Sequence, residues 1–103
     1  MRAPDQKVRA VWFRDETPKA MFFEIGVRFQ DGESWRDAIA PCWLPKSQIK
    51  IDAKHKDLWL TPWILEHKEA ELAEEYGYKC CEIVLTDSDE GWNPMEAREQ
   101  CER

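Results

Sequence analysis

Alternation of apolar and polar residues is the clearest structural signal in this chain. Between residues 20 and 30 every second position is a large apolar residue, namely Phe23, Ile25, Val27 and Phe29. A period of two is typical of a β-strand with one buried face. Asp31-Gly32 follows, a dipeptide that tight hairpin turns favour. The pattern therefore predicts a hairpin whose returning strand covers residues 34–40.

Shorter segments with the same character predict further strands. They cover residues 7–14, 49–51, 58–60 and 78–86. Pro41 and Pro45 bracket residues 42–44, and proline cannot donate a hydrogen bond to a strand ladder. We therefore expect an edge, a bulge or a turn there, with a pause in strand pairing. The basic segment 53–57 predicts a loop.

A long helix is predicted to begin at Thr61-Pro62 and to end near Tyr76, with Gly77 as its C-cap. Threonine is a good N-cap, and proline is tolerated at the first helical position because its missing N–H has no partner there. The inward stripe is expected to contain Leu65, Leu72, Ala73 and Tyr76. Trp63 is expected to cover the strand that carries Trp59 and to form an aromatic patch there, either as a buried structural residue or, alternatively, as part of a binding surface.

A second, short helix is predicted after Asn93-Pro94, because Glu96 three residues on completes a capping-box pattern. Five to six short strands with one long and one short helix predict an α+β fold. We expect a small, strongly bent antiparallel sheet or barrel of the SH3-like or OB-like kind. The length of 103 residues favours a single domain over residues 1–103.

The acidic residues are concentrated in the last part of the chain. The whole sequence has 15 Lys/Arg and 21 Asp/Glu, a net charge of −6, yet residues 1–65 carry +2 and residues 66–103 carry −8. This balance disfavours non-specific duplex binding, which depends on Lys and Arg. The candidate surface for a basic partner consists of Glu66, Glu69, Glu74, Asp87, Asp89 and Glu90. The alternative is a solvated helix face with a charged tail.

Six tryptophans are many for a chain of this length. Some are expected in the core, where aromatic side chains bury large areas. A second interpretation is a ligand site in which bases stack on tryptophans and lysines hold phosphates. Its candidate residues are Trp35, Trp43, Lys46, Lys50 and Trp59.

The cysteines and histidines predict neither a metal site nor a catalytic centre. Cys42, Cys80, Cys81 and Cys101 lack zinc-ligand spacing, and nothing in the sequence pairs them with His55 or His67. We therefore expect no cofactor, no metal and no enzymatic activity. With no secretory signal or membrane-spanning segment, we expect reduced thiols and a soluble, cytoplasmic protein.

Two motifs carry a resemblance to a group of proteins. Trp43-Leu44-Pro45-Lys46-Ser47-Gln48-Ile49, followed by the Thr61-Pro62-Trp63-Ile64 helix start, resembles segments of small uncharacterised proteins of phage and prophage genomes. The resemblance covers residues 19–67. It implies a small β-barrel with one appended helix and a viral or mobile-element context, and it brings no established catalytic residues.

Two functional hypotheses follow. The first is a non-catalytic binding protein of a phage or mobile element that occupies a host protein or protein complex in the host cytoplasm. Its acidic segment could inhibit a defence or nucleic-acid-processing complex by competing for a basic groove. The second is a small barrel that binds single-stranded nucleic acid or a nucleotide through its Trp and Lys residues.

Overall fold

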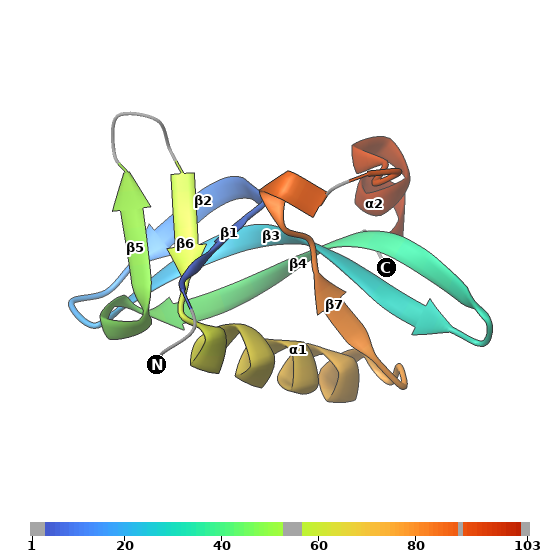
Figure 1. Cartoon of the computed structure of the whole chain (residues 1–103), viewed down its shortest axis with the longest axis horizontal. Helices are drawn as coiled ribbons and strands as arrows, with labels where there is room; N and C mark the ends of the chain where they lie inside the picture. The colour runs from blue at the N-terminus through green and yellow to red at the C-terminus, as the bar shows by residue number, and fades with distance from the viewer. Residues whose placement is uncertain (1–3, 53–56, 89, 102–103) are drawn as a thin grey trace.

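The protein has an α+β fold, as the sequence predicts (Figure 1). The computed structural model describes residues 4–52, 57–88 and 90–101. In these ranges seven strands form two antiparallel sheets, accompanied by one long and one short α-helix, and the strands do not close into a barrel. The elements are β1 (Gln6–Val8), β2 (Ala10–Glu16), β3 (Ala20–Asp31), β4 (Ser34–Pro45), β5 (Ile49–Asp52), β6 (Asp57–Leu60), α1 (Pro62–Tyr76), β7 (Cys81–Ile83) and α2 (Pro94–Cys101). Short 3-10 turns lie at Lys46–Gln48 and Thr86–Ser88.

Strand β3 is the centre of the larger sheet. It pairs with β4 along its whole length on one edge, and β2 and β7 share the other edge. Gly26 lies where these two strands meet: its N–H donates to the Arg9 carbonyl, and its carbonyl accepts from Val84 N–H. The Trp92 ring packs on Gly26 so closely that an added Cβ would lie 3.1 Å from it. A larger residue at this position would require the Trp92 ring to shift.

The smaller sheet has the order β1-β6-β5. Because β1 pairs with β6 and β2 pairs with β3, the chain passes from one sheet to the other at Arg9. The β5–β6 hairpin stands at the left of Figure 1, and the β3–β4 turn lies at the opposite end of the molecule.

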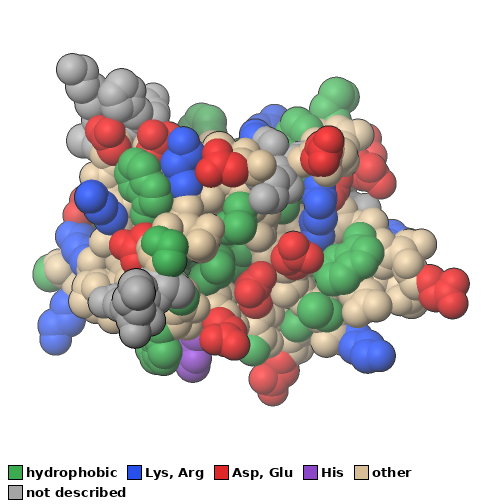
Figure 2. Space-filling model, in the orientation of Figure 1, with side chains coloured by type: hydrophobic (Ala, Val, Ile, Leu, Met, Phe, Trp, Pro, Cys, Tyr) green, Lys and Arg blue, Asp and Glu red, His purple; other side chains and the backbone are tan. Residues whose placement is uncertain are grey.

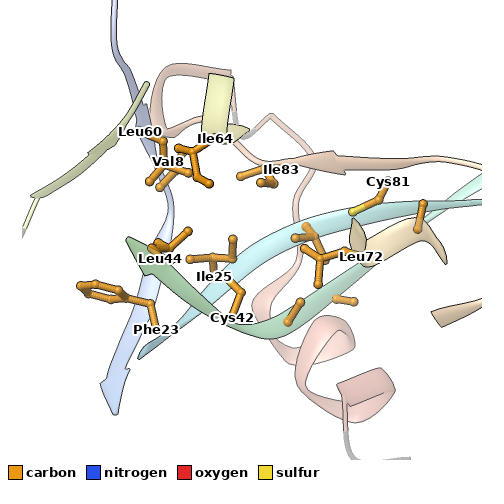
Figure 3. Close-up of a cluster of buried hydrophobic side chains, with 14 of the residues drawn as sticks. Val8, Phe23, Ile25, Cys42, Leu44, Leu60, Ile64, Leu72, Cys81 and Ile83 are labelled. Carbon is orange, nitrogen blue, oxygen red and sulfur yellow. The ribbon is translucent and has the colours of Figure 1, made fainter. Parts of the chain in front are cut away.

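The core lies between the two sheets and α1 (Figure 3). The alternation predicted for the central strand is confirmed, since the four residues that define it, Phe23, Ile25, Val27 and Phe29, are all buried. Leu58 and Leu60 enter the core from β6, and Leu72 enters it from α1. Cys42 and Cys81 are also buried, as small apolar residues of this core.

The β3–β4 hairpin is confirmed, with two differences from prediction. Asp31 pairs with Ser34, so the two turn residues are Gly32, at φ +64°, and Glu33. The expected pause in pairing at Pro41 is wrong, because β4 continues to Pro45 and stays in register with β3. The prolines are tolerated because β4 is an edge strand, where a missing N–H can face away from the sheet.

Helix α1 has the predicted bounds and caps. Thr61 Oγ1 accepts a hydrogen bond from Ile64 N at 3.3 Å, and Gly77 adopts a left-handed C-cap at φ +75°. The predicted orientation of the first turn is wrong. Ile64 enters the core, whereas Leu65 packs at its edge and Trp63 is 59% exposed. Tyr76, predicted to face inward, is exposed as well.

The C-terminal elements follow the prediction in part. Asn93 Oδ1 caps α2 by accepting from the N–H groups of Met95 and Glu96, and Ala97 is fully buried. The last strand is shorter than predicted, covering only Cys81–Ile83. Beyond it, Leu85 forms an isolated bridge with Val8.

Candidate functional site

A cleft lined mainly by acidic residues lies on the outer side of the larger sheet. We call it the acidic cleft; its volume is about 420 Å³. Its lining residues are Arg28, Trp35, Asp37, Glu82, Glu90, Gly91 and Glu96. They come from β3, β4, β7, the segment before α2 and α2 itself. The cleft therefore combines parts of the chain that are far apart in sequence.

Arg28 and Asp37 hold the cleft together. Arg28 Nε lies 3.0 Å from Asp37 Oδ1, and Arg28 Nη2 donates to the Glu90 carbonyl at 2.8 Å. Asp37 Oδ2 in turn accepts from Asn93 N–H at 2.7 Å. These bonds fix the segment before α2 against the sheet. Both charged groups thus have hydrogen-bond partners, so the role of Arg28 is to stabilise the structure of the cleft.

The remaining charges of the acidic cleft are all negative. Glu82, Glu90 and Glu96 are exposed, and none has a cationic partner within the described ranges. Trp35, at the rim, is 46% exposed. Carboxylates beside an open indole ring suit a guanidinium or ammonium group, which gains both charge attraction and a cation–π contact.

The predicted acidic residues divide into two kinds. Glu66, Glu74, Asp87 and Glu90 are exposed, as a partner surface requires, and Asp89 lies outside the described residues. Figure 2 shows acidic side chains over the α1 side of the visible face. Glu69 has a different position, because its Oε2 accepts a hydrogen bond from Ile83 N–H at 2.8 Å. Burial raises the pKa of Glu69. This residue ties α1 to β7.

The predicted tryptophan and lysine site is not brought together as one platform. Trp35 lies next to the β3–β4 turn, at the opposite end of the molecule from β5 and β6, which carry Lys50 and Trp59 (Figure 1). Trp43 stacks on Phe22, with ring centroids 4.9 Å apart.

The lysines of that predicted site also differ from one another. Lys46 is ion-paired with Glu16. Lys50 is exposed and lies opposite Trp59 in the ladder, and Lys7 lies opposite Trp59 on the other side. Trp59 and Lys50 are therefore the part of the predicted site that the structure brings together. Lys7, whose Nζ lies 3.9 Å from Asp57 Oδ1, extends them to a row of one indole ring between two lysines.

Sequence reasoning missed an apolar groove at the seam between β2 and the β5–β6 hairpin. Its volume is about 590 Å³, and we call it the seam groove. Its lining residues are Ala10, Val11, Trp12, Phe13, Met21, Phe23, Ile51, Asp57 and Leu58. The signal in the sequence is Trp12-Phe13 itself, since two adjacent aromatic residues in a strand cannot both face one core.

The cysteines differ in accessibility. Burial raises the pKa of Cys42 and of Cys81 to about 12, whereas Cys80 is exposed. Among the described residues, no group of three or more His, Cys, Asp or Glu side chains is placed to hold a metal ion. His55 lies outside those residues.

Comparison with protein-family models, curated proteins and solved structures finds no match to this chain. Within the described ranges, neither helix is long and apolar enough to span a membrane.

Proposed function

We propose that this protein is a non-catalytic binding protein of a phage or mobile element that occupies a basic site on a host protein or protein complex. The observation that carries the proposal is the acidic cleft, where Glu82, Glu90 and Glu96 surround exposed Trp35 without compensating cations in the described structure. The phage context rests on the resemblance of residues 19–67 alone.

The acidic cleft suits a partner that normally holds nucleic acid. Basic grooves bind phosphates through Arg and Lys, and a surface with several fixed carboxylates can compete for the same side chains. The backbone of the cleft is held by the Arg28–Asp37 pair, so little ordering is required on binding. A defence or nucleic-acid-processing complex is the kind of target that this chemistry favours.

A defined basic probe tests the acidic cleft directly. A polyarginine peptide is titrated into the wild-type protein by calorimetry, and into the double variant Glu90→Lys/Glu96→Lys. The control is Asp5→Lys/Glu99→Lys, which changes the net charge equally with exposed residues outside the cleft. We expect the cleft variant to lose at least about ten-fold in affinity and the control about two-fold or less.

Two outcomes would contradict the proposal. Equal losses in both double variants would mean that net charge alone attracts the peptide. Absence of binding by the wild-type protein at low salt would remove the acidic cleft as a cation site. Host-lysate pull-downs with the same three proteins, at low and high salt, then identify a cleft-dependent partner.

A second candidate function rests on the Lys7–Trp59–Lys50 row. We propose it as a site for single-stranded nucleic acid or a nucleotide, with one base stacked on Trp59 and the two lysines near phosphates. Titration with oligothymidine should quench tryptophan fluorescence in a salt-sensitive way, and Lys50→Ala should weaken the quench. The control Lys79→Ala removes an exposed lysine beyond α1 and should leave it unchanged. A flat titration at low salt rejects this function.

A further inference from the structure

Strand β2 has an exposed outer edge. It pairs with β3 on one side, and no other described strand pairs with it. Every residue from Trp12 to Glu16 is exposed. The outer edge of β2 thus presents main-chain N–H and C=O groups of the kind that pair with an incoming strand.

The seam groove lies directly beside this edge. Trp12 and Phe13 form its β2 side, and Ile51 and Leu58 form its far side. A groove of about 590 Å³ can hold more than one apolar side chain, and its lining is apolar apart from Asp57. Trp12 is 56% exposed, so a large apolar area remains uncovered in the described structure.

The pairing of β2 with β3 places its two adjacent aromatic residues on opposite faces of the strand. Neighbouring side chains of a regular strand point to opposite faces. The β2–β3 register shifts between Ala10 and Trp12 and again between Phe13 and Asp15. Trp12 and Phe13 lie between these shifts in regular register, so Phe13 lies on the side of Phe23 and Trp12 on the side of Glu24. The Arg14 guanidinium lies 5.6 Å from the Trp12 ring centroid and is bonded to Glu24 at 3.1 Å, which helps to hold the indole in place.

The edge strands β2 and β4 of the larger sheet differ in protection. β4 contains Pro41 and Pro45, and proline on an edge strand hinders pairing with another chain. β2 contains no proline, and its charged residues are confined to its last three positions, Arg14 to Glu16. The apolar first half of β2, next to the seam groove, therefore lacks the proline and the charged residues that hinder an added strand.

We propose that the seam groove is a docking site for an extended, apolar segment of a partner protein, which adds to the outer edge of β2. Main-chain bonds form with the first half of β2, and alternate apolar side chains of the segment enter the groove. The exposed main chain favours a peptide over a free apolar compound, which would leave the edge unpaired. The proposed docking site is independent of the acidic cleft, because none of the residues that line the cleft belongs to β2 or lines the seam groove.

A peptide with alternating valine and threonine residues is the test probe. Its control is the same peptide N-methylated at alternate positions, which keeps the side chains and removes main-chain donors. Calorimetry should show binding of the first peptide and at least about ten-fold weaker binding of the N-methylated one. Amide hydrogen exchange of residues 10–13 should slow when the first peptide is bound.

Variants locate the site. Ile51→Glu and Trp12→Ser alter the seam groove and should each weaken peptide binding about ten-fold, whereas Trp63→Glu alters an exposed apolar residue on α1 and should not. Circular dichroism confirms that each variant is folded. Glu90→Lys/Glu96→Lys should leave peptide binding unchanged, which separates this test from that of the acidic cleft.

Three results would overturn the proposal. Absence of peptide binding rejects the site. Equal binding of the N-methylated peptide rejects strand addition and leaves apolar contact alone. A concentration-dependent dimer in ultracentrifugation that Trp12→Ser abolishes makes a second copy of this chain the occupant instead.

Discussion

The two ends of the larger sheet carry similar apolar residues that differ in burial. Where α1 and β7 cover the sheet, Val27 and Phe29 are buried completely or nearly so. At the seam beside β2, Trp12 and Phe13 remain about half exposed although they are at least as apolar. Burial thus depends on whether another element covers a strand, and the uncovered end is where we propose that a partner docks.

Two variants at the start of α1 should give the largest difference in stability between a covered and an uncovered position. Ile64→Ala removes a core side chain and should lower the free energy of unfolding by about 2–5 kcal/mol. Trp63→Ala, one residue away, should change it by about 0.5 kcal/mol or less, because Trp63 is exposed and its ring stacks on that of exposed His67, at a centroid distance of 5.0 Å. Urea denaturation measures both. A large loss in Trp63→Ala would restore the structural role expected from the sequence.

Glu69 tests how the covered end is held together. Glu69→Ala leaves Ile83 N–H without its acceptor and should cost about 1–3 kcal/mol of unfolding free energy. Glu66→Ala is the matched control, since Glu66 is an exposed glutamate on the same helix. It should change the stability by about 0.5 kcal/mol or less. Equal values for the two variants would mean that Glu69 does not tie α1 to β7.

The protonation of Glu69 predicts a smaller, pH-dependent effect. Burial raises its folded-state pKa above the ordinary value of 4.5, so the folded state favours the protonated form. Its contribution to stability is therefore present below pH 4.5, and it is lost as the pH rises through the folded-state pKa. When the pH is raised from about 4 to about 7, the free energy of unfolding should fall further, or rise less, in the wild type than in Glu69→Gln. Urea denaturation at both pH values checks the sign, and the opposite difference would contradict burial as the cause.

The features predicted correctly from the sequence depend on residues close together in the chain. The β3 alternation, the caps at Thr61 and Gly77, and the Asn93 cap are local signals. The orientations of Trp63 and Tyr76 were predicted wrongly because they are set by the elements that α1 packs against, which the helix pattern does not encode. A weak apolar stripe leaves several rotations of a helix equally plausible.

The candidate site shows the same limit. Trp35 and Glu90 were assigned to two separate surfaces, and the structure places both in one cleft. The bond from Arg28 to the Glu90 carbonyl joins residues 62 positions apart, and no periodicity in the sequence reports such a contact. The residue types of the candidate site were thus predictable, whereas the combinations that the fold brings together were not.

The smallest expected change in stability is that of a residue at the rim of the seam groove, and a residue at the floor of the groove gives the comparison. Trp12→Ser removes an exposed rim side chain and should change the free energy of unfolding by about 0.5 kcal/mol or less. Phe23→Ser removes a buried side chain that lines the same groove and contacts Phe13 at a centroid distance of 5.4 Å, so it should cost at least about 3 kcal/mol. Urea denaturation of both variants measures the contrast. If Trp12→Ser is destabilising to a similar degree, Trp12 is part of the core, and the exposed aromatic rim that a docking segment requires does not exist.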